Sequence, residues 1–361
     1  MTDSSPMTDT ASATRYGIER AELDALLAGW GEPAYRARQV WDGLYTRRLP
    51  IEECTDLPKA LRGRLTDALA LALTLEPHEQ SRAPDGMTTK WLWTLRDGAQ
   101  VETVLMRYPT RATVCVSSQA GCAMGCTFCA TGQAGFERHL SAGEIVEQVA
   151  RAAHSCEPRV SNVVYMGMGE PLANYDATWS SIERLHDDFG ISARHITVST
   201  VGVAPAIRRL AKERLPVTLA VSLHAPTDHA RDALVPLNRR YPIADVLDAA
   251  HEFAAARGRR VTFEYACIAG VNDRADQAEA LAQLLRRFRA KGGAHVNLIP
   301  LNPTPGFSGA APAPARLQEF AGTLRRRGIT ATVRRNRGTE IDAACGQLRA
   351  RTTIPVGEAP A

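Results

Sequence analysis

Apolar side chains recur every three or four positions through the first part of the chain, which is the period of an amphipathic helix. Three such faces follow one another, and they are Leu23, Leu26, Leu27 and Trp30, then Val40, Trp41, Leu44 and Tyr45, then Leu57, Leu61 and Leu65. We therefore predict a small all-helical domain over residues 15–80. The pattern leaves open whether this domain is a packing appendage or contacts RNA.

Two strand-like runs come next. Thr88–Leu95 and Gln100–Met106 are separated by four residues that contain Asp97-Gly98. Asp-Gly between two such runs is typical of a β-hairpin. We predict a hairpin within residues 81–110 that connects the helical domain to the rest of the chain.

The body of the chain, residues 111–348, alternates short β-branched runs with helical patterns. The predicted strands are Val114–Ser118, Asn162–Met168, His195–Thr200, Val217–Leu223, Val261–Ile268, Val296–Leu301 and Thr330–Arg334. The predicted helices are Ala142–His154, Ala177–Asp188, Ala204–Arg214, Ala244–Ala256, Ala275–Lys291 and Ala315–Arg327. Ser141 and Glu144 form a capping box before the first of these helices, and the Pro/Ala-rich stretch Pro303–Ala315 is predicted to be a loop.

Repeated strand–helix alternation implies parallel βαβ units. Six or seven such units can form a partial or complete (β/α) barrel. On the pattern alone, an open doubly wound sheet is the alternative.

Composition narrows the class of protein only moderately. The 361 residues are 45% hydrophobic and 23% charged, which is enough apolar material for a core and excludes a disulfide-stapled miniprotein. The net charge of +4 permits a nucleic-acid partner but does not argue for one. No run approaches the roughly 18 consecutive apolar residues of a membrane span. Residues 1–14 are polar and lack the apolar core of a secretory signal, so we predict that they form a disordered tail. Residues 349–361 are a second predicted tail.

We expect a cytoplasmic protein whose eight cysteines stay reduced. Such cysteines are buried, metal-bound or catalytic. Three of them, Cys122, Cys126 and Cys129, cluster directly after the first predicted strand of the body, where α/β proteins place functional loops. Structural zinc usually takes four closed ligands, and the nearest histidine is His139. An iron–sulfur cluster held by three cysteines, with one iron open to a ligand, is therefore the favoured interpretation.

The Cys-x-x-x-Cys-x-x-Cys spacing resembles the signature of the radical S-adenosylmethionine (SAM) superfamily. This resemblance implies one 4Fe-4S cluster on Cys122, Cys126 and Cys129, with SAM bound at the open iron. It also implies a partial or full (β/α) barrel, in agreement with the alternation above.

Further motifs lie at the carboxyl ends of predicted strands, the functional rim of such a barrel. In Gly167-Met168-Gly169-Glu170-Pro171 the glycines let the backbone approach a ligand, and Glu170 can accept hydrogen bonds from an ammonium group. By the resemblance, the residues that bind SAM are Gly169, Glu170, Ser199, Ser222, Leu223, His224 and Asn302.

The ordered set of motifs resembles the RlmN/Cfr family of RNA methyltransferases over roughly residues 15–350. The matching stretches are Arg36–Trp41, Val101–Val104, Cys115–Gln119, the cluster motif, Gly167–Pro171, Ser222–Pro226, Ile299–Pro303 and Arg337–Leu348. The resemblance implies a partial (β/α) barrel of the radical SAM type with a small N-terminal helical domain and a connecting β-hairpin. It implies methylation of adenine carbon-2 in 23S rRNA, near the peptidyl-transferase centre, and in tRNA just 3′ of the anticodon.

Three residues outside the cluster motif gain catalytic roles from this family alone. Cys345 corresponds to a cysteine that one SAM methylates, while a second SAM is cleaved at the cluster, so two are used per turnover. Cys115 resolves the protein–RNA adduct through a transient disulfide with Cys345, and Glu102 is the proton acceptor. Without a family role, Cys54, Cys156 and Cys267 are predicted to be structural. An external electron donor such as a flavodoxin-type reductant is implied, and we expect a monomer.

Three alternatives remain on the sequence. A Cfr-type enzyme would use the same cysteines but methylate carbon-8 of adenine. Another radical SAM enzyme, such as a glycyl-radical activase, would have no use for Cys345 or Cys115, and a zinc-stabilised RNA-binding module would have no SAM chemistry. Arginines near Cys345 are candidate phosphate contacts, and they are Arg325–Arg327, Arg334, Arg335 and Arg337.

Overall fold

The computed structural model describes residues 13–74, 80–288, 293–334 and 337–349. Most of the two predicted tails, and Arg335, lie outside these residues. The helices are α1 (Arg20–Gly29), α2 (Tyr35–Trp41), α3 (Lys59–Ala68), α4 (Ala130–Ala134), α5 (Ala142–His154), α6 (Tyr175–Asp187), α7 (Ala204–Leu210), α8 (Asp228–Leu234), α9 (Ile243–Arg257), α10 (Ala275–Leu285) and α11 (Pro314–Arg326). The strands are β1 (Leu73–Thr74), β2 (Gln80–Arg82), β3 (Thr88–Leu95), β4 (Gln100–Tyr108), β5 (Arg111–Cys115), β6 (Gln119–Gly121), β7 (Phe136–His139), β8 (Val160–Tyr165), β9 (Ile196–Thr200), β10 (Thr218–Ser222), β11 (Val261–Cys267), β12 (Ala294–Pro300) and β13 (Thr330–Val333).

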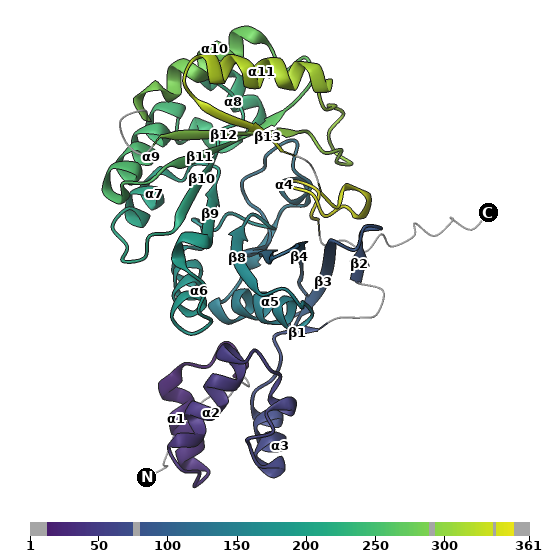
Figure 1. The fold of residues 1–361 in the computed structure, drawn as a ribbon, viewed down its shortest axis with the longest axis vertical. Helices are drawn as coiled ribbons and strands as arrows, with labels where there is room; N and C mark the ends of the chain where they lie inside the picture. Colours follow the sequence, from purple (N-terminus) through teal and green to yellow (C-terminus); the bar gives the residue numbers. More distant parts are fainter. Residues whose placement is uncertain (1–12, 75–79, 289–292, 335–336, 350–361) are drawn as a thin grey trace, which may run out of the picture.

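Seven parallel strands form the centre of the body and confirm the predicted alternation. They pair in chain order, β5-β8-β9-β10-β11-β12-β13, with helices wound around the outside (Figure 1). A doubly wound sheet would reverse its strand order near the middle, so the sequential order excludes that alternative. In the described part of the chain β13 does not pair with β5, and the barrel is therefore partial.

The predicted hairpin is present and also extends the sheet. β3 and β4 pair antiparallel, with Trp93 opposite Val101, and β4 pairs antiparallel with β5. The sequence predicts the hairpin from its Asp-Gly turn but not its union with the barrel strands, because the β4–β5 partnership has no local signal. This union places Cys115 opposite Val104.

Helix α5 has the bounds that its pattern predicts, and it fixes the start of the site. Ser141 Oγ accepts a hydrogen bond from Glu144 N, and the Glu144 carboxylate accepts one from Ser141 N, which completes the capping box. From the buried face of α5, Gln148 accepts from Ser117 N at 2.9 Å and donates to Ser117 O at 3.0 Å. The chain leaving β5 is thereby held in one path before it reaches the first cluster cysteine.

The helical segment α1–α3 lies against the end of the barrel near α5 and α6 (Figure 1). Trp41 Nε1 donates to Asp188 Oδ1 at 2.9 Å, and Arg48 donates to the carbonyl oxygen of Phe189 at 3.2 Å. Buried Glu147 of α5 accepts from Ala72 N and Leu73 N. These hydrogen bonds join the helices to the barrel. The two parts also share one continuous apolar core.

Several elements differ from the prediction. The short pieces α4, α8, β6 and β7 are not predicted, because runs of three to seven residues show too little periodicity. Helix α7 ends at Leu210 rather than Arg214, and α10 ends at Leu285, followed by a 3₁₀ turn. No helix of the described residues is long and apolar enough to cross a membrane.

Candidate functional site

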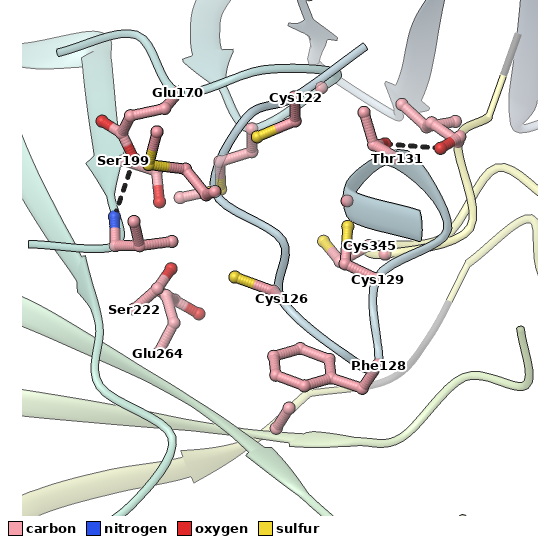
Figure 2. Close-up of a pocket in the computed structure, with 18 of the residues that line it drawn as sticks. Cys122, Cys126, Phe128, Cys129, Thr131, Glu170, Ser199, Ser222, Glu264 and Cys345 are labelled. Atoms are coloured by element: carbon pink, nitrogen blue, oxygen red, sulfur yellow. Dashed lines mark hydrogen bonds between the residues drawn. The ribbon is translucent and has the colours of Figure 1, made fainter. Parts of the chain in front are cut away.

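The three cysteines of the motif lie on one loop between β6 and β7. The two strands pair antiparallel, and Cys122 N donates to Gly135 O at 2.7 Å where the loop closes. Cys129 directly precedes α4, and Thr127 N donates to Leu234 O of α8 at 3.1 Å. All three thiols line one cavity at the carboxyl ends of the barrel strands (Figure 2).

The donor set fits a polynuclear iron–sulfur cluster better than a single metal ion. No group of three His, Cys, Asp or Glu side chains in the described residues is arranged to hold one ion. In a 4Fe-4S cluster each cysteine binds a different iron, so its sulfurs are more widely spaced. Burial raises the pKa of the Cys122 thiol to about 12, and it also raises that of Cys126. Metal binding would favour the thiolate forms of Cys122 and Cys126, which burial disfavours.

The Gly-Glu-Pro loop after β8 is held against the cluster loop. Gly169 has φ +95°, and a Cβ on it would lie 2.5 Å from the side chain of Gln119. Glu170 accepts hydrogen bonds from Leu172 N at 3.0 Å and from Val201 N at 2.8 Å (Figure 2). Burial raises the pKa of Glu170 to about 7. A buried carboxylate of this kind gains from a cationic ligand, as the predicted contact with the SAM ammonium requires.

Gly167 allows a close backbone approach that alanine would prevent. A Cβ at Gly167 would lie 2.6 Å from Val116 O. We expect Gly167→Ala to push the loops after β5 and β8 apart, lowering the free energy of unfolding by about 1–3 kcal/mol and SAM affinity at least tenfold. Equilibrium dialysis with labelled SAM and denaturant unfolding would measure the two effects.

The matched control is Gly63→Ala on α3, where a Cβ meets no atom within 4 Å. Alanine there is expected to stabilise the helix by up to about 1 kcal/mol. If Gly167→Ala leaves both SAM affinity and the unfolding midpoint unchanged, the close approach has no role in the site.

The remaining predicted SAM contacts come from three strands. Ser199, Ser222, His224 and Asn302 line the same cavity, which encloses about 1090 Å³ including its open mouth. Burial lowers the pKa of His224 to about 3, so the imidazole is neutral, and its Nδ1 accepts from Ala266 N. His224 has φ +62°, a strained conformation for a non-glycine residue. The side chain of Leu223 does not line the cavity; its carbonyl oxygen instead accepts from Arg231.

Cys345 lies between two cavities. It lines the cluster cavity beside Cys129 (Figure 2), and it also lines a second cavity inside the barrel, the lumen cavity. Cys115 and Cys345 are the two thiols of the lumen cavity. All eight cysteines are free thiols. The pKa of the Cys345 thiol is raised, mainly because the thiol is desolvated and also because the Glu264 carboxylate lies nearby.

Residues 337–349, which we call the C-terminal segment, pass from the end of β13 to β3 and β4 across the unpaired side of the barrel (Figure 1). Asn302 Nδ2 donates to Cys345 O at 2.9 Å, and Ala130 N of α4 donates to Gly346 O at 2.8 Å. Thr131 Oγ1 donates to Leu348 O (Figure 2). The position of Cys345 therefore depends on α4 and on the loop after β12.

Glu102 is placed differently from the other predicted catalytic residues. It is buried on β4 but lines neither cavity. Its carboxylate forms an ion pair with Lys90 at 2.7 Å and accepts from Arg349 N at 2.9 Å. In this arrangement the structure does not bring Glu102 together with Cys345.

Two charged residues of the site are not predicted from the sequence. Glu264 on β11 lines both cavities and accepts from Asn297 Nδ2 at 2.8 Å; a charged residue within the apolar run Val261–Cys267 is the signal that could have found it. Arg231 on α8 is fully buried beneath the cavity. Its helix gives no such signal, since an arginine among polar residues ordinarily lies in solvent.

The candidate phosphate contacts divide into two groups. Arg334 and Arg337 line the lumen cavity, close to Cys345 in space as well as in sequence. Arg325 instead donates to Ala331 O, and Arg327 forms an ion pair with Glu279.

Comparisons with known proteins identify the family of the chain. The family model described as "Radical SAM superfamily" matches residues 116–296, and "Ribosomal RNA large subunit methyltransferase N-terminal domain" matches residues 16–71. A Frankia alni protein named "Probable dual-specificity RNA methyltransferase RlmN" is 54% identical over 95% of this chain and 83% of its own length. A protein of the same name from Chloroflexus aurantiacus is 51% identical over 94% of both chains. The crystal structure of a radical SAM methyltransferase from Sphaerobacter thermophilus superposes with a TM-score of 0.88 and 49% identity, over 94% of this chain and all of that one.

Proposed function

The chain belongs to the RlmN family of radical SAM RNA methyltransferases, and from this premise we propose that it methylates carbon-2 of adenine in RNA. Carbon-2 is an electron-poor aromatic carbon and not a nucleophile, so direct displacement on a methyl donor is unavailable. The observation that supports a methyl-carrier route is the position of Cys345, which lines both the cluster cavity and the lumen cavity.

The family uses a 4Fe-4S cluster and SAM. When bound, these groups supply one-electron reduction and a radical able to remove hydrogen from an unactivated methyl group. Cys122, Cys126 and Cys129 would hold the cluster. Glu170 would accept hydrogen bonds from the amino group of SAM, while Gly169, Ser199, Ser222, His224 and Asn302 would form the rest of its binding surface. Leu223 does not line the cavity, and its proposed role is to hold the end of β10 through its backbone bond to Arg231.

The two remaining site cysteines act on the one-carbon unit. The Cys345 sulfur accepts a methyl group and then carries that carbon to adenine as a covalent link between protein and RNA. The Cys115 thiolate attacks the Cys345 sulfur, and the S–S bond forms as the bond between that sulfur and the transferred carbon breaks. The carbon keeps the electron pair of the broken bond and takes up a proton, which releases methylated RNA. A thiol reductant must then reduce the disulfide before the next turnover. Both thiols line the lumen cavity, which is the placement that this exchange requires. Glu102 is the proposed proton acceptor, and its bonds to Lys90 and Arg349 would have to open first.

The substrates proposed for this chain are 23S rRNA and tRNA, in keeping with the "dual-specificity" in the names of its relatives. An adenine must leave the base stack to reach Cys345, and single-stranded loops permit this most readily. Arg334 and Arg337 at the lumen cavity, together with the helical domain, are proposed RNA contacts. We further propose action in the cytoplasm, as a monomer, with a flavodoxin-type electron donor.

The product nucleoside tests this proposal. Purified protein with reconstituted cluster, SAM, reductant and unmodified rRNA or tRNA is expected to yield 2-methyladenosine in mass spectrometry of RNA digests. A Cys126→Ala variant, lacking one cluster ligand, is the control and should yield none. The family match over residues 16–71 does not favour a Cfr-type enzyme, and 8-methyladenosine as the product would contradict the assignment.

A further inference from the structure

Arg231 of α8 lies buried directly beneath the cluster cavity, with 0% of its surface exposed. Its Nε donates to Leu223 O at 2.9 Å, and one terminal nitrogen donates to Ser222 O at 3.1 Å and to Val201 O at 2.5 Å. The other terminal nitrogen donates to Asn238 Oδ1 at 2.8 Å. The guanidinium therefore ties together the ends of β9 and β10, which supply proposed SAM contacts.

None of these four acceptors is a carboxylate. Asp228 and Asp232 lie nearby, but both accept hydrogen bonds from Asn238 Nδ2 rather than from Arg231. Burial lowers the pKa of Arg231 to about 10, which still leaves it charged at neutral pH. A charge held out of water is costly unless other charges compensate it. Asp228 and Asp232 of its own helix act on this charge electrostatically, without a direct hydrogen bond to the guanidinium.

The cluster loop packs on the same helix. Thr127 N donates to Leu234 O, and Cys126 shares an apolar cluster with Leu234, Val235 and Val201. The positive charge of Arg231 also acts electrostatically on the Cys126 thiol. A 4Fe-4S cluster on Cys126 would therefore lie within the field of a fixed buried cation.

We propose that Arg231 sets the reduction potential of the cluster by stabilising its reduced state. Reduction adds one electron to the cluster and forms or breaks no bond, so the reduced cluster carries one more negative charge. A nearby buried positive charge favours that state, because Coulomb interactions are strong where water is excluded. The inference rests on the proposed function, since it presupposes the cluster.

The same side chain links the cluster to the proposed SAM contacts. The backbone of Val201 lies between Arg231 and Glu170: its carbonyl oxygen accepts from Arg231, and its N–H donates to the Glu170 carboxylate at 2.8 Å. Arg231 is thus a positioning residue for β9 and β10 as well as a source of charge. The experiment must separate these two effects.

A redox titration of the reconstituted protein, poised with mediators and followed by electron paramagnetic resonance, measures the potential without turnover. For Arg231→Met we expect at least a tenfold lower ratio of reduced to oxidised cluster at one applied potential, which corresponds to a shift of about 59 mV to a more negative value. Arg231→Lys keeps the charge but not the four hydrogen bonds, and it should restore most of the potential.

Arg257→Gln is the matched control, because Arg257 also donates to backbone carbonyls, of Leu210 and Glu213, on the far side of α9. It should leave the potential unchanged. A wild-type potential in Arg231→Met, or an equal shift in Arg231→Met and Arg231→Lys, would overturn the proposal in favour of a structural role. The proposal would also be overturned if neither Arg231→Met nor Arg231→Lys bound iron while Arg257→Gln did. If the wild-type chain itself binds no cluster, the proposed function fails instead.

Discussion

Cys345→Ala is expected to abolish methylation of RNA, with activity reduced by about 10³-fold or more. The residue lies where the cluster cavity meets the lumen cavity, and Cys115, the other thiol of the lumen cavity, does not line the cluster cavity. No other thiol of the described residues lines both cavities, so none can both accept the methyl group and carry it onward. Mass spectrometry of the RNA should detect no methylated adenosine, and the protein should gain no methyl group.

Cys156→Ala is the control for this change. Cys156 lies just past the end of α5 and lines neither cavity, so its removal should leave methylation within twofold of the wild type. Full activity of Cys345→Ala would disprove the methyl-carrier role. It would not contradict the proposal that the other site residues bind SAM.

Cys115→Ala is expected to stop the enzyme after the first transfer of carbon to RNA, with the RNA still covalently attached to Cys345. Cys115 and Cys345 line the lumen cavity together, and without Cys115 no described thiol there can attack the adduct. Multiple-turnover product should fall by about 100-fold, and a denaturing gel should show a protein–RNA conjugate that ribonuclease shortens. Free product at the wild-type rate, with no conjugate, would contradict the resolving role.

The pH dependence of release follows from the burial of Cys115, which raises the pKa of its thiol. Only the thiolate attacks sulfur, so release should accelerate as pH rises through the neutral range. Equilibrium dialysis of labelled SAM at the same pH values separates this effect from changes in SAM binding.

Local signals in the sequence predict most of the barrel. The capping box at Ser141 and Glu144 marks the start of α5, and Asp97-Gly98 marks the hairpin, because both depend on residues only a few positions apart. The seven β-branched runs predict the seven parallel strands for the same reason. The pairing of β4 with β5, and the path of the C-terminal segment, depend on contacts between residues far apart in the chain, so the sequence does not predict them.

The part of the site that lies at the carboxyl ends of strands is predicted from the sequence. Ser199, Ser222 and Asn302 meet in one cavity because parallel strands end on the same rim. The orientation of Glu102 toward Lys90 has no signal in its own neighbourhood, since it depends on Arg349, almost 250 positions later. The burial of Arg231 is similarly set by three loops that fold over it, and helix periodicity carries no information about them.

The unpaired side of the barrel has a consequence for the size of the substrate. A closed ring of about eight strands has an interior filled by side chains or by one small ligand, and a nucleotide within an RNA strand could not pass through it. Here the gap between β13 and β4 is spanned by a segment held at scattered points, at Asp342, Cys345, Gly346 and Arg349, rather than by a continuous ladder. Because these bonds are separate from the strand ladder, their loss would leave the pairing of the barrel strands unchanged, and the segment that they hold includes Cys345, the proposed methyl carrier.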